Sequence, residues 1–291
     1  MMQIFVNIII TSCFYLSLSL ASFLAYSTEK YFNIVYAGII VASIYFTHLF
    51  KNILEFNFFI SSILSIVLSI IINTLIILFI FQKMKIRRIQ PFSFLIASLG
   101  IYIILIGLIG YFFGYESIFL SLDKKVSSYS FFNSNISLVQ STSIISSIIL
   151  FIIICLLYYK TTIGTKIRAI SSNPNLSLNF GINSNRISLT VNVIAAFIFS
   201  FTGILIGLDT GATPNIGFEL VLYGIIVMII SGMGKLRYLV CSSLLLATVQ
   251  HLAAYFIDTK WMQVIAYVVL ILFLVWKPLG FSGKQLKKIE I

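Results

Sequence analysis

The sequence predicts an all-α, polytopic transmembrane helical bundle with about 8–10 membrane segments. Of its 291 residues, 60% are hydrophobic and only 9% are charged, whereas about a quarter of the residues in an ordinary soluble domain are charged. The mean hydropathy is correspondingly high, at +1.09. Because roughly 20 apolar residues cross a bilayer core, these spans use most of the chain. We therefore expect a single transmembrane domain over residues 1–291, with any ATP hydrolysis supplied by other subunits.

Nine apolar runs carry this prediction. They cover residues 4–26, 33–50, 58–81, 92–114, 142–159, 187–208, 219–233, 238–257 and 262–276. All 27 charged residues lie outside these runs or at their rims, as expected when an ionised side chain at mid-bilayer costs at least about 2.5–3.5 kcal/mol. The run at 33–50 is short and contains Asn33, Gly38 and His48, so a re-entrant segment is the alternative to a span. The first run has no basic segment before it, which favours a retained helix over a signal peptide.

The loop charges predict the orientation. If the tail at 277–291 is cytoplasmic and the runs alternate, the cytoplasmic segments hold 15 Lys and Arg residues and the external segments hold four. Short loops rich in Lys and Arg stay on the cytoplasmic side, so we expect a cytoplasmic C-terminus. The external loop at about 115–141 is rich in Ser and Asn, and either a lid-like element or a mobile surface loop fits its composition.

Several classes of function are disfavoured. The net charge of +11 lies in short loops between spans, and not on a soluble basic face that could bind nucleic acid. No metalloprotease, nucleophile-elbow or Walker motif is present, and the three cysteines are isolated. We therefore expect no catalytic residue, metal or cofactor, and no enzyme activity. We also expect no carboxylate buried in a span, which argues against a transporter with a charged coupling site. His251 either faces a polar pathway or is an ordinary packed histidine.

The glycines indicate where helices pack or end. Gly203 and Gly207 form a GxxxG pattern, which usually allows close packing within a polytopic protein. A second set of glycines predicts close approach along the run 92–114: Gly100, Gly107, Gly110 and Gly114. The sequence SGMGKLRY at 231–238 predicts a helix end at Gly232 and Gly234.

The longest polar interruption of the C-terminal half is KTTIGTKIRAISSNPNLSLNFGINSNR, the 160–186 loop. It has four cations and no acid, and it has room for one or two short helices. Asn173 suits an N-cap and Pro174 the first turn of a helix, and Gly181 suits a left-handed helix end. Apolar contacts are offered by Leu176, Leu178, Phe180 and Ile182. From the residues alone, both a docking helix and an ordinary basic anchor loop remain open.

From about residue 92 to 284, the chain resembles the membrane permeases of branched-chain amino-acid ABC importers. The resemblance rests on GTKIRAISSNPNLSLNFGIN, AAFIFSFTGILIGL, TPNIGFELVLYGIIVMIISGMGKLRYLVCSSLLLATVQ and VLILFLVWKPLGFSGK. In that family, G-x-x-x-R-A, N-P and G-I-N mark the cytoplasmic loop that docks on the ATPase. The matching residues here are Gly164, Arg168, Ala169, Asn173, Pro174, Gly181, Ile182 and Asn183. Departures from the family pattern occur at Tyr36, Asn175–Ser177, Tyr223, Ser231 and Gln250.

The resemblance implies a permease subunit in the cytoplasmic membrane of a bacterium. Its implied partners are two cytoplasmic ABC ATPase subunits, a second permease subunit, an extracytoplasmic solute-binding protein and the lipid bilayer. The implied substrate is a branched-chain amino acid or a related small polar solute. The alternatives are an ABC permease for urea, an amide or another solute, and a channel or facilitator that works without an ATPase.

Overall fold

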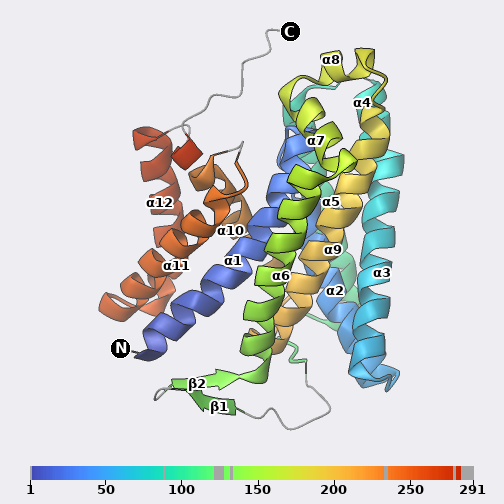
Figure 1. Cartoon of the computed structure of the whole chain (residues 1–291). Helices are drawn as coiled ribbons and strands as arrows, with labels where there is room; N and C mark the ends of the chain where they lie inside the picture. Colours follow the sequence, from blue (N-terminus) through green and yellow to red (C-terminus); the bar gives the residue numbers. More distant parts are fainter. Residues whose placement is uncertain are drawn as a thin grey trace. The chain divides into compact units, whose positions relative to one another are not determined.

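The computed structural model describes residues 2–87, 89–120, 128–131, 134–232, 235–277 and 280–282, and it confirms an all-α architecture (Figure 1). The helices are α1 (Met2–Glu29), α2 (Val35–His48), α3 (Phe58–Ile76), α4 (Gln82–Ile86), α5 (Pro91–Phe113), α6 (Leu138–Lys160), α7 (Thr162–Ser172), α8 (Pro174–Asn179), α9 (Ser184–Thr210), α10 (Ile216–Ser231), α11 (Tyr238–Phe256) and α12 (Met262–Trp276). Single π-helical turns follow α2 and α3, and short 3-10 turns flank α12.

Seven of the described helical segments are long and apolar enough to cross a membrane. They are Met2–Glu29, Phe58–Ile86, Pro91–Phe113, Leu138–Lys160, Ser184–Thr210, Tyr238–Phe256 and Thr259–Trp276. The run at 219–233 forms α10, which is apolar but shorter. The run at 33–50 forms α2, which has 14 residues, twelve of them buried. The chain is therefore a multi-pass membrane protein, and α2 is an interior helix and not one of the long spans.

The chain forms two compact units, each assembled from separate stretches. Unit 1 comprises 1–23, 127–182 and 222–291, and unit 2 comprises 24–126 and 183–221. Because the chain enters each unit more than once, neither unit is a contiguous segment of sequence.

In unit 2, α2 packs against α3, α5 and α9. The GxxxG pattern on α9 allows this packing: a Cβ on Gly203 would lie 2.9 Å from the Ile40 side chain, and one on Gly207 would lie 2.8 Å from that of Ile44. The pattern therefore serves packing within the chain, as predicted. The expectation of close approach was wrong for Gly100, Gly107 and Gly114, because a Cβ on any of them would meet no atom within 4 Å, and at Gly110 a Cβ would meet the Tyr115 side chain.

Polar residues line the inner face of α3. Its buried residues recur at every fourth position, at Ser61, Ser65, Ser69 and Asn73, which places them on one side of the helix. The Ser65 hydroxyl lies 2.7 Å from that of Thr47 on α2. Small polar residues allow close helix packing in a membrane, so the apolar side chains of α3 are left on the outer face.

In unit 1, hydrogen bonds join α1 to α6 and α11. The Tyr15 hydroxyl donates to Gln250 Oε1 at 2.7 Å, and the Ser17 hydroxyl lies 2.8 Å from that of Ser147. Gly224 of α10 faces the Leu18 carbonyl, where a Cβ would lie at 2.9 Å. The first part of α1 is therefore held by polar contacts on two helices of this unit.

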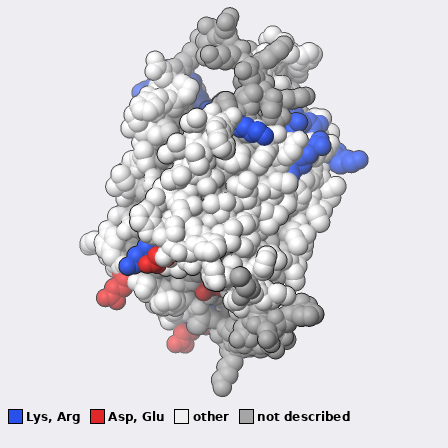
Figure 2. Space-filling model, turned by 90° about the vertical axis from the view of Figure 1, so that its left-hand side faces the viewer, with Lys and Arg blue, Asp and Glu red and all other residues white. Residues whose placement is uncertain are grey.

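The segment 115–141 contains a hairpin. Strands β1 (Ser128–Phe131) and β2 (Ser134–Ser137) pair antiparallel, and Ile118 forms an isolated bridge with Ala212. Residues 121–127 and 132–133 lie outside the described part of the segment. In Figure 2, the centre of the face shown is uncharged, and the coloured side chains lie towards its ends, as expected for a surface in contact with lipid.

The 160–186 loop and a buried polar network

The first half of the 160–186 loop forms α7, which is fixed to α6. Its buried residues, Gly164, Ile167 and Ile170, lie on one face. A Cβ on Gly164 would come within 2.3 Å of the carbonyl oxygens of Leu157 and Tyr158. Only glycine therefore permits this approach of the α7 backbone to the end of α6.

The Arg168 side chain is directed back to α6. Its guanidinium donates a hydrogen bond to the Tyr158 carbonyl. The guanidinium carbon also lies 5.6 Å and 5.9 Å from the ring centroids of Tyr158 and Tyr159, within the range of a cation–π contact. The carbonyl is one of the last of α6, where a cation interacts favourably with the helix dipole. Arg168 therefore anchors α7.

The second half of the loop forms α8. The side chain of Asn173 accepts a hydrogen bond from the backbone N–H of Leu176 at 3.0 Å, and Pro174 occupies the first turn. Gly181 follows with a φ of +74°. These local features are as the sequence predicts. Asn183 then accepts from the backbone N–H of Arg186 at 3.2 Å and caps α9.

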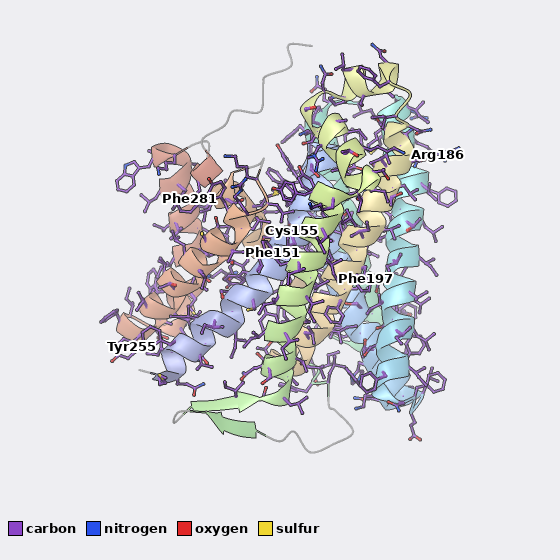
Figure 3. All side chains as sticks on the ribbon, in the orientation of Figure 1. Phe151, Cys155, Arg186, Phe197, Tyr255 and Phe281 are labelled. Carbon is purple, nitrogen blue, oxygen red and sulfur yellow. The ribbon has the colours of Figure 1, made fainter. Side chains whose placement is uncertain are left out.

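The second half of the loop exposes apolar side chains. Leu176, Leu178 and Phe180 are 54%, 56% and 77% exposed. The side chains of Lys160, Lys166 and Arg186 in the same loop are also exposed, and Figure 3 shows Arg186 near the N-terminal end of α9.

The residues of the family pattern therefore fall into three groups. Gly164 and Arg168, with the neighbouring Ala169, belong to the anchored helix α7. Asn173, Pro174 and Gly181 shape the ends of the exposed α8, and Ile182 and Asn183 lead into α9.

A buried carboxylate lies in unit 2, which corrects the expectation that none is buried in a span. Glu29 ends α1, and its side chain is 2% exposed. Its Oε2 lies 2.7 Å from the Lys85 ammonium. Its Oε1 accepts hydrogen bonds from the Ser188 hydroxyl and from Asn192 Nδ2, the latter at 2.8 Å. Hydropathy placed Glu29 at a rim, but contacts with distant segments bury it.

Further donors complete the network around Asn192. The Tyr36 hydroxyl donates to Asn192 Oδ1, and Asn73 Nδ2 donates to the Asn192 carbonyl at 3.3 Å. The Tyr36 ring also stacks on Phe199, with a centroid distance of 4.7 Å. In the sequence Tyr36 is only a departure from the family pattern, but the structure buries it among the helices of unit 2.

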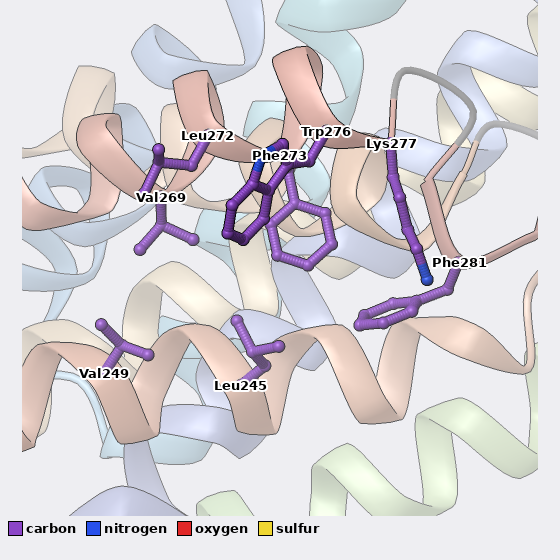
Figure 4. Close-up of a pocket in the computed structure, with 8 residues that line it drawn as sticks. All are labelled: Leu245, Val249, Val269, Leu272, Phe273, Trp276, Lys277 and Phe281. Carbon is purple, nitrogen blue, oxygen red and sulfur yellow. The ribbon is translucent and has the colours of Figure 1, made fainter.

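His251 forms a polar contact within unit 1: its Nε2 lies 2.8 Å from the Thr11 hydroxyl. An ordinary packed histidine explains this contact. Unit 1 also has a cavity of about 620 Å³ between α11 and α12 (Figure 4). Lys277 is the single charged residue among its described lining residues, and the other seven are apolar. A polar solute needs convergent polar groups, so this cavity does not suit one.

Among the described residues, no group of three or more His, Cys, Asp or Glu side chains could hold a metal ion. The loop and the Glu29 network thus offer binding surfaces and conformational contacts.

Comparison with known proteins identifies the family. Residues 4–274 match the model of the permease component of branched-chain amino acid transport systems. Over 154 residues the chain is 24% identical to the high-affinity branched-chain amino acid permease LivH of Salmonella typhimurium and 23% identical to that of Escherichia coli. Over 126 residues it is 27% identical to BraD of Pseudomonas aeruginosa.

These alignments cover 53% of the chain for LivH and 43% for BraD. The chain spans about half the length of the curated relatives it matches, 50% of LivH and 41% of BraD. Among solved structures, PsaBC from Streptococcus pneumoniae in complex with Fab is similar in fold, with a TM-score of 0.52 at 12% identity over 97% of this chain and 93% of that one. The match over residues 4–274 shows that this multi-pass membrane protein belongs to the permease-component family of branched-chain amino acid transport systems.

Proposed function

We propose that the chain is a permease subunit of a bacterial ABC importer and moves a branched-chain amino acid, or a related small polar solute, across the cytoplasmic membrane. The family match over residues 4–274 carries this proposal. The whole chain acts as one transmembrane permease domain. It works with two cytoplasmic ATPases, a second permease subunit and an extracytoplasmic solute-binding protein.

The ATPase docks on α8. A docking helix needs apolar side chains that are exposed until the partner covers them, and this helix and the residue that follows it expose Leu176, Leu178 and Phe180. Exposed cations in the same loop agree with its predicted place on the cytoplasmic side. The C-terminus lies on that side as well. By contrast, α7 supports α8 through Gly164 and Arg168.

Co-purification of the permease with its ATPases tests the docking surface. Leu178→Asp should reduce recovery of the ATPases at least about tenfold, since it replaces an exposed apolar contact by a charge that must be desolvated. Asn179→Asp, which adds the same charge to the next residue, is the matched control. Equal recovery with wild type and Leu178→Asp would refute docking on this surface, as would undiminished assembly after bulky or acidic substitution of Arg168 and Gly181.

Uptake assays separate the remaining alternatives. A deletion strain carrying the chain and its neighbouring transport genes should accumulate labelled leucine only while ATP is available. Accumulation of urea or an amide in place of leucine would reassign the substrate within the ABC class. Equilibration without any ATPase would favour a channel or facilitator.

A further inference from the structure

The Glu29 network joins two places where the chain enters unit 2. The chain passes into this unit at 23/24 within α1 and again at 182/183, directly before α9. Glu29 lies shortly after the first entry and Ser188 shortly after the second. Although 159 residues separate them in sequence, the Ser188 hydroxyl donates directly to the Glu29 carboxylate.

The carboxylate contacts consecutive turns of α9. Ser188 and Asn192 lie four residues apart, so their side chains share one face. Asn192 Nδ2 donates to Glu29 Oε1 and also to the Ser188 carbonyl, each at 2.8 Å. Lys85 completes the arrangement from α4, because its ammonium contacts Glu29 Oε2 at 2.7 Å and Ser188 Oγ at 3.1 Å. One carboxylate thus binds the ends of α1 and α4 to the start of α9.

The buried charge of Glu29 explains why these three helix ends resist separation. A carboxylate with a 2% exposed side chain is stable in an apolar bundle only while its cation and donors stay in place. If α9 moved alone, it would withdraw the Ser188 and Asn192 donors and leave the carboxylate with Lys85 and the Tyr31 side chain. Movement of the three helix ends together keeps every contact. Neutral packing would resist such separation far less, because sliding apolar surfaces leaves no charge without partners.

We infer that Glu29 is a positioning residue for energy coupling, which makes the start of α9 move together with the ends of α1 and α4. This inference rests on the proposed function, in which an ATPase displaces the 160–186 loop. Since α9 begins directly after that loop, its first turns receive the displacement. Through Glu29 and Lys85 the displacement reaches α1 and α4, and through Asn192 it reaches Tyr36 of the central helix α2.

The test uses the full permease reconstituted with its ATPases and binding protein. For each variant, solute uptake and ATP hydrolysis are measured on the same vesicles, and their ratio is compared. Glu29→Gln should reduce uptake per ATP about tenfold, within the usual range of coupling effects, while the ATPases still co-purify. Lys85→Gln should act in the same direction. Lys83→Gln removes an exposed cation from the same short helix and should leave the ratio unchanged.

Two further measurements distinguish a role of Glu29 in positioning α9 from a role in the stability of the protein alone. Exchanging the charges, with Glu29→Lys and Lys85→Glu together, should restore much of the ratio lost in either single reversal, because hydroxyl and amide groups can serve both ions. Hydrogen exchange in the first turns of α9 should rise in Glu29→Gln and not in Lys83→Gln. Loss of protein without a change in uptake per ATP would show a merely structural role and overturn the inference.

The outcomes for this inference and for the proposed function are distinct. If wild-type vesicles show no ATP-dependent uptake, the proposed function fails and this inference fails with it. If wild type is coupled and Glu29→Gln keeps its ratio within about twofold, below the usual coupling range, only this inference is overturned. Should Glu29→Gln fail to accumulate, Ser188→Ala decides, because it removes one donor and keeps the Lys85 ion pair. A lowered ratio supports coupling, and an unchanged ratio overturns it.

Discussion

Replacing Gly164 by alanine should detach α7 from α6. A Cβ at this position would lie 2.3 Å from two backbone carbonyl oxygens, those of Leu157 and Tyr158. Real Cβ atoms keep at least 3.0 Å from other atoms, so α7 must shift by at least 0.7 Å. Neither oxygen can turn aside, because both belong to the main chain at the end of α6.

The cost of this shift follows from what α7 buries. Ile167 and Ile170 are 0% and 2% exposed, so displacement strains a closely packed face, at a cost of about 1–3 kcal/mol. Alanine regains a part of this, since it is a better helix former than glycine by about 1 kcal/mol. From the middle of that range, the net loss of about 1 kcal/mol should raise local opening of α7 roughly fivefold.

Amide hydrogen exchange of the purified protein measures this opening directly, because it reports the free energy of local unfolding. Peptides covering 162–172 should exchange faster in Gly164→Ala. The matched control is Thr165→Ala, which creates the same residue at an exposed position of the same helix and should not accelerate exchange. If Gly164→Ala exchanges at the wild-type rate, the close approach of α7 to α6 is refuted.

Three other predictions concern the stability of the bundle, measured as thermal unfolding in detergent. Gly203→Leu should destabilise unit 2 by about 1–3 kcal/mol, because even its Cβ would lie 2.9 Å from the Ile40 side chain. Gln250→Leu should cost about 0.6–1.7 kcal/mol for each hydrogen bond between membrane helices that it removes, namely the one from the Tyr15 hydroxyl and the one to the Met262 carbonyl. Glu55→Gly should stabilise by about 1 kcal/mol, since φ there is +54° and glycine adopts this conformation without strain.

Control variants show whether each change in stability comes from the contact named for it. Gly100→Leu, at a position with no atom within 4 Å of an added Cβ, should be nearly neutral where Gly203→Leu is not. Thr248→Val removes only a hydrogen bond to the Leu244 carbonyl of its own helix, so it should cost less than Gln250→Leu. Equal losses within either pair would contradict the packing and hydrogen bonds described for α9 and α11. A lower unfolding temperature for Glu55→Gly would contradict strain at that turn.

The sequence predicts features that depend on neighbouring residues. Hydropathy locates all nine helices that lie in the apolar runs, because membrane burial acts on each segment separately. Capping chemistry likewise locates α8, since Asn173 and Pro174 act within one turn of themselves. The left-handed backbone at Gly181 can also be predicted locally, because glycine at a helix end favours it. Each of these features is determined within a few residues of the one that signals it.

Features that depend on distant residues could not be predicted in this way. Gly100 and Gly203 give the same local signal, yet only Gly203 faces another helix closely. Glu29 stands beside Lys30 in a polar turn, so hydropathy indicates a solvated rim. Its burial depends on Lys85 and Ser188, which the chain supplies much later. A buried ion pair leaves no local periodicity, and it becomes visible only when the helices are assembled.

The contacts on either side of α8 explain how, in the proposed function, the 160–186 loop could stay attached to the bundle and also pass on movement. Gly164 and Arg168 fix the helix before α8 to the end of α6, and Glu29 holds the helix after it through Ser188. Between these anchors, α8 exposes its apolar side chains and has no comparable attachment among its described contacts. In the proposed function, a partner bound to α8 would therefore act along the chain on α7 before it, and on α9 after it through the short connection at Gly181 and Ile182.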